Sequence, residues 1–256
     1  MPELPEAETI VRSLAPLVQG RVITKATFPG KRVLRGPMPE LTGNRIQCVA
    51  RHGKRVLLEL RHGRLLFSLG MTGALLWNAE PGAYTRAIFE LDGARLLFDD
   101  IRQFGNVQYL DGEPQGLGPD PLEISAAEFY TRLRERRTQL KRLLLDQSFV
   151  RGLGNIYCDE ALFRAALHPR TKTERLTSLR AERLHEAIRA LLEEAIARRG
   201  SSISDYVDAQ GERGGFQQFH RVYGKEGEPC SACGAAIRRI VLAQRGTHYC
   251  PRCQRP

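Results

Sequence analysis

The sequence is short of lysine, tryptophan and long apolar runs. Only 6 of its 39 Lys and Arg residues are lysine, and it contains one Trp. No stretch of about 18 apolar residues occurs, which excludes a transmembrane helix. The first residues lack a basic region followed by an apolar stretch, so no secretory signal is expected. These absences favour a protein of the cytoplasm with no membrane partner.

Charge is distributed unevenly along the chain. The net charge is +10. Residues 126–256 carry 24 Lys+Arg against 15 Asp+Glu, a net of +9, whereas residues 1–125 carry 15 against 14, a net of +1. A basic half beside a nearly neutral half indicates a polyanionic partner, most simply nucleic acid. The alternative is that the arginine-rich composition reflects codon bias.

Hydrophobic periodicity predicts a β-rich first part of the chain. Apolar residues recur at helical spacing over residues 5–18, which predicts a helix that Pro16 should kink or end. Short runs of β-forming residues follow, separated by His-Gly and Asp-Gly turns. Strands are expected over residues 45–51, 55–60, 64–69, 74–77, 85–91 and 95–98. Many short strands with regular turns favour a sandwich or a barrel.

A second, helical part follows a segment rich in Pro and Gly at residues 111–122, which we interpret as a linker. Ser125 with Glu128 forms a capping-box pattern that starts the next helix. Helices are expected over residues 125–137, 138–146, 156–167 and 179–199. The polar, glycine-rich residues 201–215 are expected to form a mobile loop.

Four of the six cysteines lie in the last 27 residues, spaced Cys230-x2-Cys233-x16-Cys250-x2-Cys253. Each pair places two thiolates on one knuckle, and two knuckles make a closed tetrahedral zinc site. Disulfides would need an oxidising compartment, which nothing else in the sequence indicates. Because four thiolates leave no open coordination position, we expect one structural Zn²⁺. Arg245, near the tip of the hairpin expected between the knuckles, suits a phosphate contact or is simply solvated.

The first residues hold two prolines and two nearby carboxylates, and they have two interpretations. If Met1 is removed, Pro2 is a secondary amine that is partly unprotonated near neutrality. Such an amine attacks an aldehyde-level carbon to give an iminium ion, the chemistry usually supplied by lysine. Glu3 and Glu6 lie close enough to donate or accept a proton. The simpler interpretation is that the prolines stiffen the start and the carboxylates favour a helix N-terminus.

Other residues suit contact with nucleic acid, each with an ordinary structural alternative. Asn155 follows two glycines and precedes a helix, where it suits a phosphate or a helix cap. Lys54 begins a strand after a His-Gly turn, where it could act in catalysis or bind phosphate. The structural alternative is an ordinary lysine at the edge of a sheet. Two apolar residues, Met71 and Phe104, are expected at loop tips beside an arginine, Arg102. Such residues can wedge into a base stack, unless the two apolar side chains are core.

Together these motifs resemble the formamidopyrimidine-DNA glycosylase (Fpg) family, bacterial type, over essentially the whole chain. The motifs that carry the resemblance are Pro2-Glu3-Leu4-Pro5-Glu6, Gly53-Lys54-Arg55, Leu69-Gly70-Met71-Thr72-Gly73, Arg102-x-Phe104-Gly105, Gly152–Tyr157, Val222-Tyr223-Gly224 and the zinc finger with Ala243-Gln244-Arg245-Gly246-Thr247. The resemblance implies an α+β multidomain fold. Its expected parts are an N-terminal catalytic β-sandwich domain flanked by helices (1–112), a linker (113–124), a helical DNA-binding domain with a helix–two-turn–helix motif (125–220) and a four-cysteine zinc finger (221–256).

The resemblance also implies a function in base excision repair. The protein would be a bifunctional DNA glycosylase and AP lyase that excises oxidised purines, 8-oxoguanine and formamidopyrimidines, from double-stranded DNA. Pro2 would form a Schiff base with the damaged sugar, and β,δ-elimination would follow. The resemblance further implies a monomer in the bacterial cytoplasm, associated with the nucleoid through DNA. Two alternatives remain: an endonuclease VIII-type glycosylase for oxidised pyrimidines, and a lesion-binding protein without catalysis.

Residue roles carry over from the family onto matching positions. The expected site residues are catalytic Pro2, Glu3, Lys54 and Arg245, supporting Glu6, and DNA-binding Met71, Arg102, Phe104, Asn155 and Tyr223. The segment 201–224 would close over the extruded base. One departure is Ser68, at a position where the family often has a histidine. A serine there keeps one hydrogen-bond donor but carries no charge.

Overall fold

The computed structural model describes residues 2–255. The chain folds into two compact units, and each is described by itself. Unit 1 consists of Met1–Gln115 and Arg198–Gln217, and unit 2 consists of Gly116–Ala197 and Gln218–Pro256. The chain therefore leaves unit 1, forms the helices of unit 2, and returns to unit 1 for one short segment before it completes unit 2. The domain boundaries drawn from the sequence follow chain order, and they stay a prediction.

Unit 1 is built on two antiparallel sheets of four strands each, in the orders β1-β6-β7-β5 and β2-β3-β4-β8. Phe67 of one sheet packs edge-on against Phe89 and Phe98 of the other, at 5.7 and 5.9 Å between ring centres. The expected sandwich is confirmed, with two strands, β1 and β8, beyond those expected. The strands are β1 (Ile23–Thr27), β2 (Ile46–His52), β3 (Arg55–Leu60), β4 (Arg64–Ser68), β5 (Gly73–Trp77), β6 (Thr85–Leu91), β7 (Ala94–Asp100) and β8 (Asn106–Leu110).

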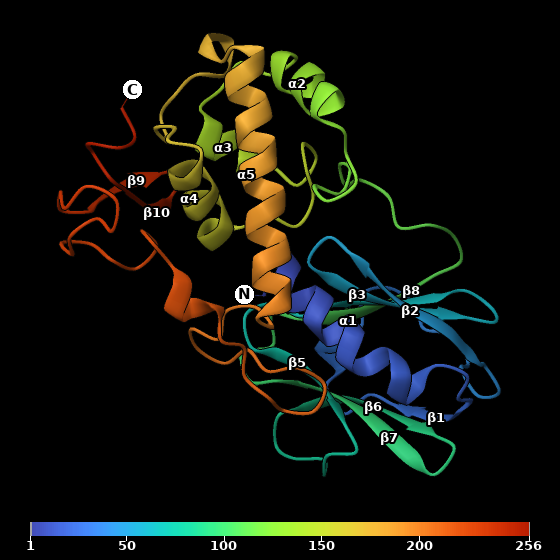
Figure 1. The fold of residues 1–256 in the computed structure, drawn as a ribbon. Helices are drawn as coiled ribbons and strands as arrows, with labels where there is room; N and C mark the ends of the chain where they lie inside the picture. The colour runs from blue at the N-terminus through green and yellow to red at the C-terminus, as the bar shows by residue number, and fades with distance from the viewer. Residues whose placement is uncertain (1, 256) are drawn as a thin grey trace. The chain divides into compact units, whose positions relative to one another are not determined.

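Helix α1 (Leu4–Val18) lies along the sandwich and packs against β2, β3 and β5, so that it touches both sheets (Figure 1). Its apolar stripe, which includes Ile10 and Leu14, is fully buried. Of the two outcomes expected for Pro16, an end of the helix is wrong, because α1 continues to Val18. Pro16 has no N–H for the Arg12 carbonyl, but it lies in the last turn and only two helical residues follow it, so little of the helix is affected.

Unit 2 contains the helices α2 (Ala126–Arg134), α3 (Leu140–Leu145), α4 (Asn155–Arg164) and α5 (Ser178–Ala197). Ser125 caps α2, because its hydroxyl accepts the Glu128 N–H at 3.1 Å, as expected from the capping-box pattern. The helix ends at Arg134, earlier than expected. Helices α3 and α4 follow each other in the chain and pack against each other, which suits the expected helix–two-turn–helix motif. Among the described residues, no helix has the length and apolar character needed to span a membrane.

The hairpin of β9 (Arg238–Leu242) and β10 (Arg245–Tyr249) completes unit 2. Strand β10 packs against α4, so the cysteine-rich end of the chain lies beside the second helix of the motif (Figure 1). A small core that includes Phe163, Val222 and Ile237 fills this contact.

Candidate active site and nucleic-acid interface

The start of α1 is anchored by a buried carboxylate. Glu3, the residue that caps α1, is 4% exposed and donates its backbone N–H to Glu6 Oε2 at 2.7 Å. Glu6 is 1% exposed, and its other oxygen, Oε1, accepts the backbone N–H of Ser201 at 2.7 Å. Glu6 therefore bonds both to the expected acid/base residue and to the segment 198–217. Pro2 is buried beside them, while Met1 lies outside the described residues.

Lys54 lies in the tight turn between β2 and β3. Arg51, just before this turn, forms an ion pair with Glu8 of α1 at 2.9 Å. Burial alone would raise the pKa of Glu8, but hydrogen bonds from Arg12 and Arg51 lower it below its ordinary value. The ion pair therefore holds the end of β2 that leads to Lys54 against the first turns of α1, which also carry Glu3 and Glu6.

The segment 198–217 is firmly tied to unit 1 at its base. Tyr206 is buried in the sandwich core and donates its hydroxyl toward the Glu6 carbonyl at 3.3 Å. The Arg213 guanidinium donates to the carbonyls of Ser202 and Ser204 at 3.2 and 2.8 Å. Ile203, between those two carbonyls, is 52% exposed. An exposed apolar side chain thus lies between two hydrogen-bonded residues of the segment that the sequence predicts to be a mobile loop.

Met71, Arg102 and Phe104 come together in unit 1, as expected. The Arg102 guanidinium lies 4.7 Å from the centre of the Phe104 ring, and its Nη1 is 3.2 Å from the Met71 sulfur. Met71 is 43% exposed and Phe104 is 57% exposed. These side chains are therefore a surface cluster, and the alternative that the two apolar residues are core is excluded.

Buried Asp100 fixes the two loops that carry this cluster. Its Oδ2 accepts the Gly105 N–H at 2.7 Å, and its Oδ1 accepts the Thr72 hydroxyl. The Thr72 oxygen in turn accepts the Arg102 N–H at 3.0 Å. Gly70 has a φ of +59°, and a Cβ there would lie 2.7 Å from the backbone N of Gly105. The loops approach so closely that only glycine fits at this point.

In unit 2, Asn155 joins the start of α4 to the zinc-finger hairpin. Gly154 caps the helix, and Asn155 is its first residue, so the alternative role of Asn155 as the cap is wrong. The Asn155 amide donates to the Gly246 carbonyl at 2.9 Å. Gly246 follows Arg245, whose side chain is exposed. The Asn155 side chain therefore lies against the hairpin beside Arg245.

A buried ion pair lies beneath these two residues, and sequence reasoning missed it. Lys141 and Asp159 have fully buried side chains that pair at 2.6 Å. Lys141 also donates to the Asn155 carbonyl at 3.1 Å, and Asp159 accepts the His248 backbone N–H at 2.9 Å. The pair therefore fixes α3, α4 and β10 to one another. The available signal was a lysine among the leucines of α3, in a chain with few lysines.

Glu160 was also missed, and it positions Tyr223. It is fully buried and accepts the backbone N–H groups of Arg221, Val222 and Tyr223 at 2.8–3.0 Å. Burial raises the pKa of Glu160, although these hydrogen bonds oppose the shift. The Tyr223 ring packs edge-on against His220 and His248, at 5.8 and 5.2 Å between ring centres.

The four cysteines of the predicted zinc site come together. The sulfurs of Cys230, Cys233, Cys250 and Cys253 all lie within 4.8 Å of one another. Two of the separations are 3.9 and 3.4 Å. A tetrahedral Zn²⁺ with Zn–S bonds of about 2.3 Å places its sulfurs about 3.8 Å apart. The cluster therefore fits a closed, structural zinc site that holds the β9–β10 hairpin.

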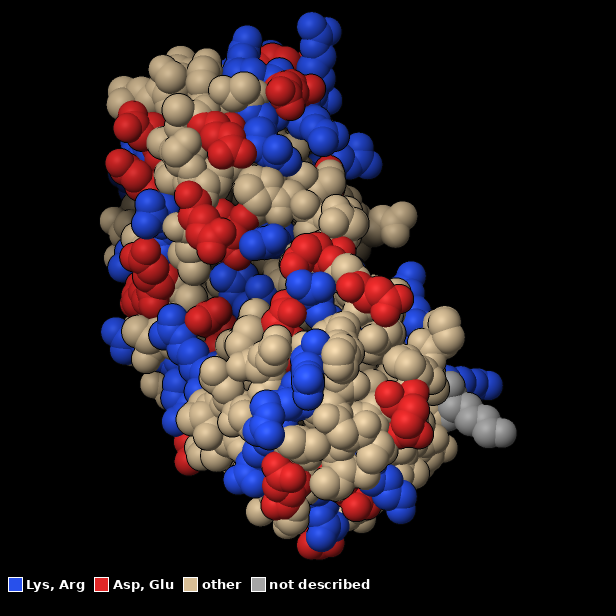
Figure 2. Space-filling view, turned by 90° about the vertical axis from the view of Figure 1, so that its right-hand side faces the viewer, with Lys and Arg blue, Asp and Glu red and all other residues tan. Residues whose placement is uncertain are grey.

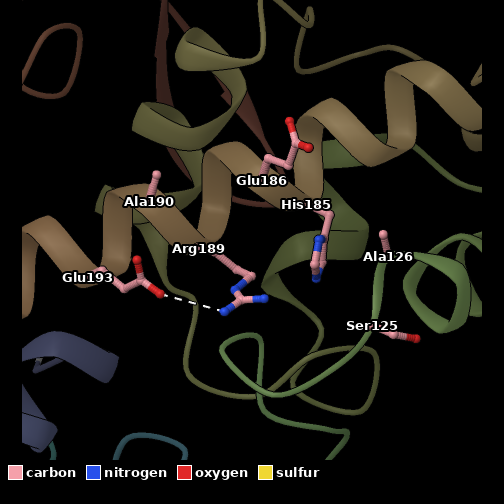
Figure 3. Close-up of a pocket in the computed structure, with 7 residues that line it drawn as sticks. All are labelled: Ser125, Ala126, His185, Glu186, Arg189, Ala190 and Glu193. Carbon is pink, nitrogen blue, oxygen red and sulfur yellow. Dashed lines mark ion pairs between the residues drawn. The ribbon is translucent and has the colours of Figure 1, made fainter.

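The two signs of charge are mixed on one face of the protein. On the face shown in Figure 2, Lys and Arg side chains lie among Asp and Glu side chains, and neither sign covers the face. A cavity of about 430 Å³ between α5 and the start of α2 illustrates the point (Figure 3). Its Arg189 pairs with Glu193 at 3.7 Å, and Glu186 adds a second carboxylate. None of the expected site residues lines this cavity.

The structure thus groups the expected residues within each unit. Unit 1 holds Pro2, Glu3 and Glu6 at the start of α1, Lys54 in the turn between β2 and β3, and the cluster of Met71, Arg102 and Phe104. Unit 2 holds Asn155, Arg245 and Tyr223 with the four cysteines. Ser68, the departure from the family pattern, ends β4 opposite Asn106 of β8.

A sandwich with buried carboxylates at its N-terminus, a helix–two-turn–helix motif and a four-cysteine finger define a zinc-finger protein of the helix–two-turn–helix class. Family models agree in each part of the chain: the formamidopyrimidine-DNA glycosylase N-terminal domain (residues 1–107), the H2TH domain of the same enzyme (117–207) and the zinc finger found in FPG and IleRS (227–256). The chain belongs to the formamidopyrimidine-DNA glycosylase family.

Individual relatives match over full length. The formamidopyrimidine-DNA glycosylase of Solibacter usitatus is 50% identical, with 100% of both chains covered. The crystal structure of the Fpg protein of Thermus thermophilus matches with a TM-score of 0.90 at 42% identity, covering 99% of this chain and 98% of that one. A Lactococcus lactis Fpg variant in complex with Fapy-dG containing DNA matches with a TM-score of 0.92 at 34% identity, with 100% of both chains covered.

Proposed function

We infer that this chain is a DNA glycosylase of base excision repair that removes formamidopyrimidines and related oxidised purines from double-stranded DNA. Family membership, the name shared by its relatives and the lesion DNA bound by the Lactococcus lactis protein support this activity. The observation that carries it within this chain is the anchoring of Glu3 by Glu6, at 2.7 Å, beside Pro2. That arrangement fixes an amine and a carboxyl group at the same end of α1.

We propose that Pro2, once Met1 has been removed, is the nucleophile. Its nitrogen forms a bond to C1′ of the damaged nucleotide, and the glycosidic bond breaks with its electron pair passing to the protonated base. Opening of the sugar ring gives an iminium ion, with Glu3 as the general acid and base for these proton transfers. The iminium ion acidifies C2′, and loss of that proton expels the 3′ phosphate. A second elimination expels the 5′ phosphate, which makes the protein an AP lyase as well.

The remaining residues receive roles that match their surroundings. Glu6 holds Glu3 in place, and Lys54 supports the site and the DNA backbone. Asn155 and Arg245 bind phosphates, Tyr223 contacts the DNA, and the structural zinc, one per chain, holds the hairpin that carries Arg245. These roles separate the phosphate contacts of Asn155 and Arg245 from the bond-making and proton transfers proposed for Pro2 and Glu3.

We propose that the exposed cluster of Met71, Arg102 and Phe104 fills the gap left when the damaged base is flipped out of the helix. The Arg102 guanidinium would donate to acceptor groups of the unpaired cytosine. The segment 201–224, in which Ile203 is exposed, would cover the extruded base. We further propose that the protein acts as a monomer on the chromosome, in the bacterial cytoplasm.

Two variants test the division between binding and chemistry. Arg245→Ala should weaken binding to damaged and undamaged duplex alike and make the slope of log affinity against log salt shallower by about one unit. Glu3→Gln should keep the affinity and abolish base excision, because it preserves shape and removes the titratable proton. Binding and single-turnover rates measured over a salt series decide the assignment. It is wrong if Glu3→Gln loses affinity as Arg245→Ala does.

An endonuclease VIII-type activity is the second candidate. Single-turnover excision should be compared on matched duplexes that carry a formamidopyrimidine, 8-oxoguanine or an oxidised pyrimidine. The proposed function predicts faster release of the two purine lesions. Preferential release of the pyrimidine would establish the second candidate, and tight binding of every lesion without excision would indicate a lesion-binding protein.

A further inference from the structure

A second basic site lies in unit 2, beside the tip of the zinc-finger hairpin. It is a cavity of about 350 Å³. Its lining residues are Arg137, Thr138, Gln139, Arg142, Lys172, Glu174 and Ala243. The cavity thus brings three basic side chains and a single carboxylate together. Ala243 is at the hairpin tip, two residues before Arg245.

The backbone that carries these side chains is fixed by hydrogen bonds. Gln139 and Lys172 pair as an antiparallel bridge. The Thr173 N–H donates to the Thr138 carbonyl at 3.0 Å, and the Thr138 N–H donates to the Thr173 hydroxyl oxygen at 3.2 Å. Thr173 is fully buried. Arg137 and Lys172 therefore extend from two short segments locked side by side, rather than from independent loops.

The three basic side chains form no hydrogen bond or ion pair within the part of the chain that the structure describes. Arg137, Arg142 and Lys172 are all exposed there. The arginine in the cavity of Figure 3, by contrast, is paired with Glu193. Glu174 has a pKa below its ordinary value because of its own backbone N–H, the Thr173 hydroxyl, and the charges of Lys172 and Arg137. One carboxylate cannot neutralise three cations, so the site retains a positive excess.

The site is linked to the residues expected to bind phosphate. Helix α3, which carries Arg142, also carries Lys141, whose ammonium group donates to the Asn155 carbonyl. Ala243 shares the β9–β10 hairpin with Arg245. The new site therefore shares one helix and one hairpin with the residues expected to bind phosphate. The sugar–phosphate backbone of a duplex is a polyanion with one charge per about 1.7 Å of axis, long enough to reach both.

We propose that Arg137, Arg142 and Lys172 form a second phosphate-binding element, which binds the duplex backbone beyond the phosphates held by Asn155 and Arg245. The proposal rests on the proposed function, since it takes duplex DNA as the ligand. The element extends the length of DNA that the protein contacts and carries no base specificity, because it offers only cations to phosphates. Glu174 limits its affinity.

The test measures binding alone, on a duplex with an uncleavable abasic-site analogue, over a salt series. The triple variant Arg137→Ala/Arg142→Ala/Lys172→Ala should bind more weakly, with a salt slope shallower by about two to three units, because each phosphate that is neutralised contributes about 0.9 to the slope. Glu174→Gln should bind more tightly than wild type. Arg61→Ala, an exposed arginine in the turn between β3 and β4 of unit 1, is the control and should leave the slope unchanged.

Varying the duplex length distinguishes a direct phosphate contact of these three residues from a general effect of the lower net charge of the triple variant. Two further duplexes are each shortened on one side of the lesion, and on one of them the difference between wild type and the triple variant should vanish. The proposal is overturned if the triple variant keeps the wild-type slope, if Arg61→Ala lowers the slope as much as the triple variant does, or if the effect is equal on all three duplexes. Because wild-type excision is measured separately, failure of the proposed function would appear there and not in these slopes.

Discussion

Glu6 and Ser201 are joined by a hydrogen bond of 2.7 Å across 195 residues of sequence, in which the Ser201 backbone N–H donates to the buried carboxylate. The other oxygen of the same carboxylate accepts the Glu3 N–H. One side chain thus connects the segment expected to cover the extruded base to the residue expected to move protons. Ser201 of that segment and Glu3 are therefore held in one hydrogen-bonded network through Glu6.

Glu6→Gln tests this connection. The amide keeps the size of the side chain but places an NH₂ group against one of two backbone N–H donors, so a buried hydrogen bond is lost at a cost of about 1–3 kcal/mol. Base excision and strand cleavage should both fall, while affinity for undamaged duplex should change little. Glu90→Gln, on the exposed face of β6, is the matched control. Wild-type single-turnover rates for Glu6→Gln would show that the connection has no part in the reaction.

Phe104→Ala tests the surface cluster. The ring is 57% exposed and lies under the Arg102 guanidinium, so its loss removes a stacking surface with little effect on the fold. Flipping should cost about 1–3 kcal/mol more, which slows excision roughly 5- to 150-fold while binding to undamaged duplex is kept. Tyr84→Ala, another exposed aromatic of unit 1, should excise normally. Equal losses for Tyr84→Ala and Phe104→Ala would refute the wedge role.

Zinc removal should abolish DNA binding and leave the sandwich of unit 1 folded. Chelation, or Cys250→Ser, should release the β9–β10 hairpin and with it Arg245, because metal binding supplies the local folding energy. DNA binding should then be lost while the sandwich keeps its β-sheet circular dichroism. Metal analysis should find one zinc per chain, and Cys48→Ser, outside the cluster, should retain it. Normal DNA binding by Cys250→Ser would contradict the structural role of the metal.

His220 should make unfolding of unit 2 sensitive to acid. Burial, and then the charge of Lys225, lower the pKa of His220 from 6.5 to about 4. Because the unfolded chain binds the proton more readily, this histidine removes stability as pH falls from about 6.5 toward 4, by up to about 3 kcal/mol. His220→Gln should flatten the pH dependence of the unfolding free energy in that window. An unchanged slope relative to wild type, with exposed His62→Gln as control, would refute this.

The zinc site, the helix cap and the loop residues could be predicted from the sequence because the residues that determine them are close together in the chain. The knuckles of the zinc site place their thiolates three residues apart, and the Ser125 cap reaches only to Glu128. Met71 was readable as a loop-tip residue because Gly70 and Gly73 lie near it on either side, and Phe104 because strand alternation places it on one face with Arg102. In each case the neighbours that decide the structure stand beside the residue in sequence.

Long-range polar contacts were not readable in the same way. Asn155 was expected to be a phosphate ligand or a cap, yet its amide bonds to Gly246, 91 residues later. Lys141 and Asp159 look like ordinary surface residues until the packing of α3 on α4 removes both from water. The return of residues 198–217 to unit 1 depends on Glu6 and on the burial of Tyr206, and neither has a local signature.

Trapping the covalent intermediate tests the role of Pro2 most directly. The protein is incubated with duplex DNA that contains an abasic site, the iminium ion is reduced with borohydride, and the crosslinked peptide is identified by mass spectrometry. We expect a crosslink at Pro2 in protein that has lost Met1, and none in protein that retains Met1 or is acetylated at its terminus. A crosslink at Lys54, or full strand cleavage by protein that retains Met1, would contradict the assignment of Pro2 as the nucleophile.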